Sequence, residues 1–207
     1  MEFINRMILS LPALLIALTF HELAHGYVSY LLGDPTAKSQ GRLSLNPIAH
    51  IDPIGFASLL FFRFGWAKPV PIDPRYYKNR KLGTILVSLA GPATNFLLAI
   101  ITGLFLKFSY QFELEIIYAN DIISAIIGNL LIYNITLGVF NLIPIPPLDG
   151  SKILASLLPI KYEIKFYQLE RYSMVLLIVM MYFGIFSKIL NPLVNSAIGI
   201  FVKTIFL

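Results

Sequence analysis

Long runs of apolar residues constrain this chain more than any other feature of its sequence. A helix needs about 20 mostly apolar residues to cross the hydrocarbon core of a membrane. Four runs reach or approach that length: 7–32, 82–106, 122–143 and 173–190. The segment 192–207 is shorter, so a fifth span is left open. We therefore expect an all-α integral membrane protein, a bundle of four to five transmembrane helices that forms a single membrane-embedded domain over 1–207.

The composition agrees with a membrane protein and excludes several other classes. Hydrophobic residues make up 57% of the chain and charged residues 13%, and the mean hydropathy is +0.76. Soluble proteins carry about 25% charged residues. The absence of cysteine excludes a disulfide scaffold and a thiol nucleophile. The first apolar run continues past the length of a signal peptide's hydrophobic region, so we expect no cleaved leader.

The basic residues gather in two of the connections between the apolar runs. Eight of the 16 Lys and Arg residues lie in 33–81 and four more in 151–171, whereas 107–121 holds three acidic residues and one Lys. Basic connections stay on the cytoplasmic side of a membrane. We therefore expect a multi-pass protein of the cell membrane with its N-terminus outside. The net charge of +5 then marks the cytoplasmic face and not a nucleic-acid partner.

A shorter apolar segment lies between the first two runs. At about a dozen residues, 54–64 suits a re-entrant or interfacial segment better than a span. The sequence GWAKPVP follows at 65–71, and its Trp favours the membrane interface. Its prolines suit an edge strand, to which an extended peptide can add. We therefore expect a re-entrant or interfacial, strand-like segment around 54–72.

The first apolar run contains three ionisable residues within five positions, in the sequence HELAH. Ionisable groups inside a spanning helix are costly and indicate function by default. His21 and His25 are four residues apart, so both lie on one face of a helix and can hold one metal ion. Glu22 is rotated by about 100° from His21 and can reach a water beside the metal without being a ligand. We predict a zinc site with Glu22 as general base; the alternative is a polar cluster that binds helices or relays protons.

A catalytic zinc site usually has three protein ligands, so a third must come from elsewhere in the chain. The candidates are His50, Asp52, Asp73 and Asp149. Asp149 is favoured, because a proline-rich stretch ends the third apolar run on the side where the two histidines lie. Without the histidines, Asp149 would be interpreted as a turn or cap residue.

Two amides inside the apolar runs are further candidates for the site. Asn141 lies about two helical turns before Asp149, and its amide can donate to an oxyanion. Its alternative role is an ordinary interhelical hydrogen bond, worth ~0.6 kcal/mol in membranes. Asn95 follows the pair Gly91-Pro92, which predicts a kink and a point of close packing. We expect Asn95 to satisfy the backbone groups that the kink frees.

Five motifs resemble those of the site-2 proteases, which are intramembrane zinc metalloproteases, and occur in the same order. They are HELAH at 21–25, the NP and HIDP pairs within 46–53, GWAKPVP at 65–71, AGPATN at 90–95, and the stretch from Asn141 to Asp149-Gly150. The resemblance covers roughly residues 10–155 and is to the short prokaryotic members, which carry no appended domains. The family often has another helix before the HExxH helix, and we expect none here.

The resemblance implies roles for particular residues. It assigns one zinc ion per chain to His21, His25 and Asp149, and the general base to Glu22. It places Asn95 and Asn141 near the active site, as support for the substrate or oxyanion. It also implies that the GWAKPVP segment holds unwound substrate, with Gly65, Trp66, Lys68 and Pro69 as the candidate residues.

The predicted function is hydrolysis of a peptide bond within, or at the edge of, a transmembrane segment of a single-span membrane protein. The predicted active site faces the cytoplasm. A membrane metal transporter or metal sensor could use the same three ligands, but transporters usually contain repeated broken helices, and this sequence shows no repeat. An inactive scaffold that binds helices is a third interpretation. Substrate identity and oligomeric state, including a homodimer, are left open.

Overall fold

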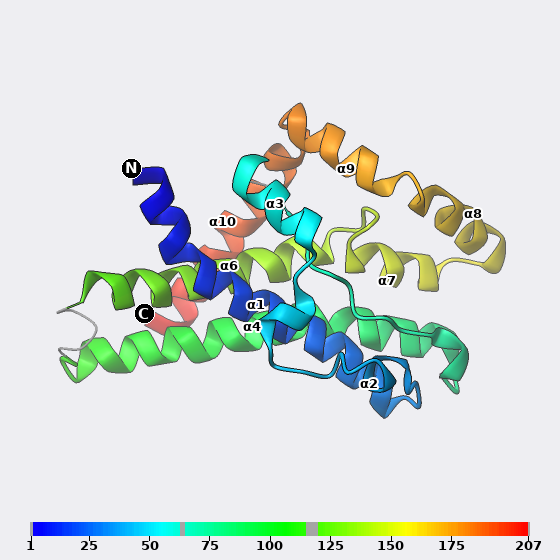
Figure 1. Ribbon diagram of the computed structural model, residues 1–207, viewed down its shortest axis with the longest axis horizontal. Coiled ribbons are helices and arrows are strands. Elements are labelled where there is room, and N and C mark those ends of the chain that lie inside the picture. Colours follow the sequence, from blue (N-terminus) through cyan, green and yellow to red (C-terminus); the bar gives the residue numbers. More distant parts are fainter. Residues whose placement is uncertain (1, 63–64, 115–119, 207) are drawn as a thin grey trace.

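A computed structural model describes residues 2–62, 65–114 and 120–206, and the regular elements of these residues are helical (Figure 1). Four helices are long and apolar enough to cross a membrane: α1 (Glu2–Leu31, apolar from Ile8), α4 (Arg80–Gln111), α6 (Asp121–Leu142) and α10 (Ile185–Phe206). The described residues form no strand longer than an isolated bridge. The prediction of an all-α membrane protein is confirmed.

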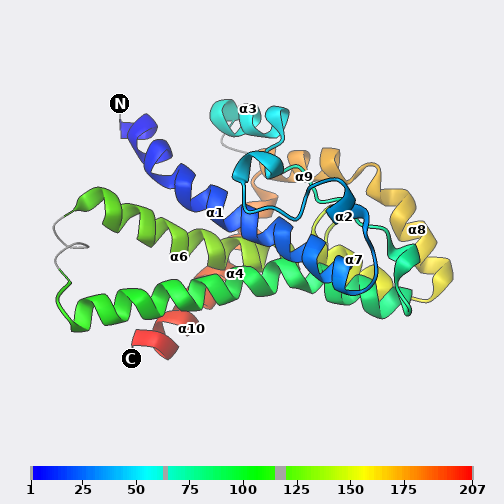
Figure 2. The ribbon, with the colours of Figure 1, turned by 60° about the horizontal axis from the view of Figure 1, so that its bottom comes forward.

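Three of the long helices form the bundle that carries the site. α4 and α6 run antiparallel, and α1 lies across both of them (Figures 1 and 2). α10 packs on the other side of the pair. Small residues allow these close approaches: a Cβ at Gly138 of α6 would lie 2.9 Å from the ring of Phe96 on α4. Close packing through small residues is typical of helices in membranes, where no hydrophobic effect drives them together.

The C-terminal helices differ from the expected span over 173–190. Instead of one span, the structure has two helices: α9 (Ser173–Tyr182) ends at Tyr182, and α10 begins at Ile185 and continues through Pro192. Gly184 separates them with a φ of +66°, a left-handed conformation that glycine adopts without strain and that ends a helix. The span prediction was wrong because hydropathy does not report this break. The segment 192–206 belongs to the fourth long helix, and residue 207 lies outside the described residues.

The connection between α1 and α4 carries short elements: α2 (Thr36–Ser39), the 3₁₀ turns η1 (Pro47–His50) and η2 (Pro74–Tyr76), and α3 (Pro53–Phe62). The strand-like expectation over 54–72 was wrong for its first half, since α3 satisfies its own backbone groups as a helix capped by Asp52 Oδ1. From residue 65 to 73 the chain is extended, and Ala67 forms an antiparallel bridge with Ile51. Residues 63–64 lie outside the described part of the chain.

Buried polar groups hold this extended segment (65–73) against the bundle. Arg42 donates to the carbonyl oxygens of Lys68 at 2.7 Å and of Pro69 at 3.1 Å. The Asp73 N–H donates to Asp34 Oδ2 at 2.7 Å, at the end of α1. Burial alone would raise the pKa of Asp34, but hydrogen bonds from Thr36, the Asp73 N–H and Ser29 outweigh it and hold that pKa below its ordinary value. Asp34 therefore anchors the segment as a carboxylate at neutral pH.

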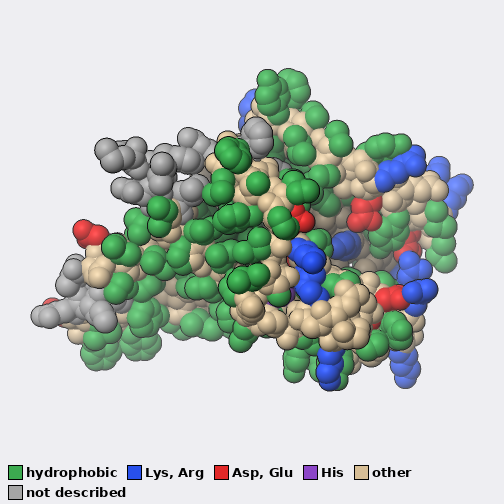
Figure 3. Space-filling view, in the orientation of Figure 1, with side chains coloured by type: hydrophobic (Ala, Val, Ile, Leu, Met, Phe, Trp, Pro, Cys, Tyr) green, Lys and Arg blue, Asp and Glu red, His purple; other side chains and the backbone are tan. Residues whose placement is uncertain are grey.

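Charge is distributed unevenly over the molecule. Most of the Lys and Arg side chains visible in Figure 3 lie at the end that carries α2, α7 (Asp149–Leu157) and α8 (Ile160–Glu170). Hydrophobic side chains cover the long helices between the two ends. The first turn of α1 and the last turn of α10 lie toward the opposite end (Figure 1). The basic end is also where the three predicted metal ligands converge.

Candidate metal centre

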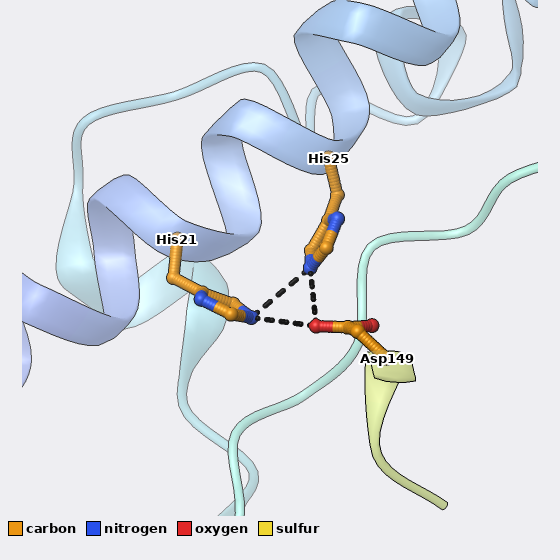
Figure 4. A group of neighbouring side chains, drawn as sticks. All are labelled: His21, His25 and Asp149. Carbon is orange, nitrogen blue, oxygen red and sulfur yellow. Dashed lines mark hydrogen bonds and ion pairs between the residues drawn. The ribbon is translucent and has the colours of Figure 1, made fainter. Parts of the chain in front are cut away.

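Three side chains from two distant segments meet inside the bundle (Figure 4). His21 Nε2 and His25 Nε2 lie 3.0 Å apart, and they are 3.2 and 3.1 Å from Asp149 Oδ2. Both histidines project from one face of α1, and Asp149 is the first residue of α7. All three are buried. Among the described residues, no other group of His, Asp or Glu has this metal-ligand geometry.

The hydrogen bonds behind the imidazoles determine where each ring carries its proton. His21 Nδ1 lies 2.6 Å from Asn95 Oδ1, and His25 Nδ1 lies 2.6 Å from the Val87 carbonyl oxygen. Both partners only accept, so each Nδ1 carries hydrogen and donates it. In the neutral rings, each Nε2 then has a free lone pair, and these two lone pairs face each other and a carboxylate oxygen. A cation resolves this repulsion, and a set of two imidazoles and one carboxylate fits zinc.

Gly91 of α4 allows the imidazoles their position. A Cβ at residue 91 would overlap His25 Nε2 and would lie 2.5 and 2.6 Å from His21 Cε1 and Nε2. The sequence indicated Gly91-Pro92 as a point of close packing, and the structure shows that the packing partners are the two predicted ligands. The backbone of α4 therefore forms one wall of the centre.

We expect Gly91→Ala to weaken zinc binding by about 10-fold or more, because the added methyl group displaces both rings; displaced outer contacts of metal sites cost 10–100-fold. The measurement is a competition titration of zinc against a chromophoric chelator. Gly128→Ala is the matched control, since a Cβ at Gly128 of α6 meets no atom within 4 Å. Equal zinc affinities for the two variants would contradict this assignment.

Glu22 lies beside the three ligands and outside their set. Its Oε2 accepts a hydrogen bond from the Val70 N–H at 2.9 Å, which connects it to the extended segment. Glu22 lines a cleft of about 280 Å³ together with the three ligands. The side chain is partly exposed. A carboxylate in this position can exchange a proton with a water in the cleft.

The other predicted site residues are placed unequally. Gly65, Trp66 and Pro69 line the cleft, and so does Asn141, whose Nδ2 donates to Leu137 O of its own helix at 3.1 Å. Lys68 does not line it; its N–H donates to the His50 carbonyl oxygen at 2.9 Å.

Asn95 differs from expectation. It is fully buried, does not line the cleft, and contacts His21 and Asn134 instead of the backbone freed at Pro92. A proline inside a helix leaves a backbone carbonyl without its helical hydrogen bond. The Asn95 side chain nevertheless turns toward α1 and α6. It therefore lies behind the centre and outside the lining of the cleft.

The remaining candidates for the third ligand have other partners. His50 Nε2 lies 2.8 Å from the Ser44 carbonyl oxygen. Asp52 caps α3, and Asp73 pairs with Arg75 on the surface. Each of these groups therefore has a local structural role.

Several contacts of the centre could not be found from the sequence alone. Lys152 Nζ lies 3.6 Å from Asp149 Oδ1 and lines the cleft. The Val87 partner is a backbone carbonyl, which leaves no signal in residue type. Asn134 does leave a signal in the sequence, since an amide inside an apolar run is costly and needs hydrogen-bond partners. Arg42 was counted only as a loop charge, although it is buried and binds the extended segment.

Known proteins match this chain in two independent ways. The sequence profile of peptidase family M50 matches residues 111–184, which include Asp149 but not HELAH. A Bacillus subtilis (strain 168) protein named "Putative zinc metalloprotease YwhC" is 40% identical over 184 residues, which is 88% of this chain and 84% of the relative. This chain belongs to peptidase family M50, the site-2 proteases.

Further relatives agree. A Mycolicibacterium smegmatis protein named "Putative zinc metalloprotease Rip2" is 30% identical over 72% of this chain and 57% of its own length. A Rip2 protein of Mycobacterium tuberculosis is 31% identical over 66% and 52%. No solved structure matches the chain. The site-2 protease described here is thus a multi-pass intramembrane zinc metalloprotease, and the prediction made from its motifs is confirmed.

Proposed function

We propose that His21, His25 and Asp149 hold the zinc ion of this site-2 protease and that Glu22 is its general base. The observation that carries the proposal is the meeting of three acceptor atoms within 3.2 Å of one another, at a cleft that Glu22 also lines. When bound, zinc polarises a substrate carbonyl and makes water a stronger acid. The hydrogen-bonded Nδ1 atoms keep both rings oriented for this role.

In this proposal, Glu22 moves a proton during the reaction. Its carboxylate accepts the proton of the attacking water and returns it to the nitrogen of the leaving amine. The Val70 N–H donates to Glu22 Oε2 and so fixes the carboxylate at the edge of the cleft. Asn141 lines the same cleft and is proposed to donate to the substrate carbonyl oxygen.

The proposed substrate is a single-span membrane protein. A transmembrane helix must unwind before cleavage, because its carbonyls are hydrogen bonded within the helix. The extended segment lies along the cleft with Gly65, Trp66 and Pro69 in its lining, and an unwound peptide can add to such an edge. The backbone N–H of Lys68 donates to the His50 carbonyl oxygen, and its carbonyl oxygen accepts from Arg42. These hydrogen bonds keep the segment extended.

The proposed orientation places the N-terminus outside the cell and the cleft toward the cytoplasm. Lys and Arg gather at the end of the molecule where the ligands converge, and basic ends of membrane proteins stay inside.

We further propose that residues 1–207 act as one membrane-embedded catalytic domain. α1, α4 and α6 supply the core, and the connection 32–79 and α7 complete the site.

Purified protein incubated in detergent with a panel of single-span membrane proteins tests the function. We expect cleavage of at least one protein within or beside its transmembrane segment, its loss with a zinc chelator, and its return when zinc is added back. A chelator-insensitive cleavage would contradict the proposal.

A further inference from the structure

The amide of Asn95 is connected on both sides within the bundle. Its Oδ1 lies 2.6 Å from His21 Nδ1 on α1. Its Nδ2 donates to the Ala17 carbonyl oxygen at 3.2 Å and to Asn134 Oδ1 at 2.8 Å on α6. Asn95 and Asn134 both have exposed fractions of 0%. Buried polar groups at such depth are costly unless every atom has a hydrogen-bond partner. The hydrogen bonds of Asn95 and Asn134 therefore depend on the orientation of both amides.

The direction of these hydrogen bonds follows from their far end. Asn134 Nδ2 donates to the Leu130 carbonyl oxygen at 2.8 Å, and a carbonyl can only accept. Asn134 must therefore present Oδ1 to Asn95. If Asn95 were flipped, its own oxygen would face two acceptors, Asn134 Oδ1 and the Ala17 carbonyl oxygen. Asn134 Oδ1, at the shorter distance, and the Ala17 carbonyl oxygen thus both oppose the flip and keep the oxygen of Asn95 against His21.

The orientation of Asn95 in turn decides the tautomer of His21. Facing an oxygen, His21 Nδ1 carries the hydrogen, and Nε2 keeps the lone pair that points at Asp149 and His25. Facing the NH₂ group of a flipped Asn95, Nδ1 would accept, the hydrogen would move to Nε2, and that atom could not bind a metal. We propose that Asn134 is a positioning residue that fixes the zinc-binding tautomer of His21 through Asn95. This inference rests on the assignment of His21 as a zinc ligand.

The test compares zinc affinity and the His21 tautomer in variants of the full-length protein. Zinc affinity comes from competition with a chromophoric chelator, and the tautomer from ¹⁵N NMR of labelled imidazoles in the zinc-free protein. We expect Asn134→Leu to bind zinc about 10–100-fold more weakly, the range for outer partners of metal ligands. We also expect it to raise the population of the His21 tautomer with hydrogen on Nε2, since only the longer hydrogen bond, to the Ala17 carbonyl oxygen at 3.2 Å, then opposes the flip of Asn95.

Two further variants separate this role from simple packing. Asn129→Leu makes the same change on the same helix at a residue outside the described hydrogen bonds of Asn95, and should match wild type. Asn134→Asp should restore affinity and tautomer, since a neutral carboxyl group presents a carbonyl oxygen to Asn95 and donates its O–H to Leu130 O. If Asn134→Leu does not fold, Asn134→Ala replaces it, because alanine also removes the oxygen that accepts from Asn95 and is expected to give the same loss of zinc affinity and the same change of tautomer.

The outcomes distinguish this inference from the proposed function. An unchanged His21 tautomer in Asn134→Leu, or an equal loss of affinity in Asn129→Leu, would overturn the inference alone. A His21→Ala variant with wild-type zinc affinity would overturn the ligand assignment beneath it. Failure of Asn134→Asp to restore the tautomer would also count against the inference, since packing volume is preserved there.

Discussion

Glu22→Gln is expected to lower the rate of peptide-bond cleavage by about 10²–10⁴-fold, the usual contribution of general acid–base catalysis. The amide keeps an oxygen that accepts from the Val70 N–H, so the side chain stays in place. It cannot accept the proton of a water, so only the chemical step is lost. Single-turnover cleavage of a membrane substrate gives the rate, and elemental analysis gives the zinc content.

The zinc content separates this prediction from damage to the metal centre. Glu22 is not among the three clustered ligands, so the variant should hold zinc at the wild-type ratio. Glu163→Gln is the matched control: the same change on α8, where the carboxylate pairs with Lys81 at 3.7 Å, away from the cleft. Wild-type cleavage by zinc-loaded Glu22→Gln would refute the general-base assignment.

Asp149→Ala is expected to weaken zinc binding by on the order of 100-fold or more, since even outer contacts of a metal site cost up to that much. The change removes the carboxylate that both Nε2 atoms approach and leaves two imidazoles. Cleavage should be lost with the zinc. Competition with a chelator measures the affinity, and zinc added in excess should restore little activity.

A control for the removal of charge is available at the other end of the protein. Asp121→Ala removes an exposed carboxylate from the first turn of α6, outside the cleft. It should leave zinc binding unchanged. If Asp149→Ala kept the full zinc affinity, the third ligand would have to be another group, although Asp52 and Asp73 have local partners and His50 is held through its Nε2 by the Ser44 carbonyl oxygen.

The extended segment shows a limit of reasoning from sequence. The prolines of 65–71 indicated extended backbone, which the structure shows from 65 to 73, but the preceding apolar residues formed α3. A ten-residue apolar stretch has no period that separates a buried helix from a strand. Arg42 illustrates the same limit: its buried guanidinium binds two carbonyls more than 25 residues away, and in the sequence it was one of eight basic residues in a loop.

The C-terminal region shows a second limit of prediction from sequence. Apolar residues continue from α9 into α10, so hydropathy predicted a single span over 173–190. The division depends on the backbone conformation of Gly184, which φ reveals and composition does not. Pro192, the first residue of the segment left open as a fifth span, lies inside α10, since proline is tolerated in membrane helices where neighbouring groups compensate for the missing hydrogen bond.

By itself, the sequence determined what depends on local periodicity: the long apolar helices, and His21 and His25 one turn apart on one face with Glu22 beside them. These follow because 3.6 residues per turn relate neighbours in the chain directly to neighbours in space. Only the tertiary structure decided which group completes the centre and what orients it. Asp149 is 124 residues from His25, and Val87, Gly91 and Asn134 reach the centre from other helices. Such contacts depend on how helices pack, which is a property of pairs of surfaces that no single segment contains.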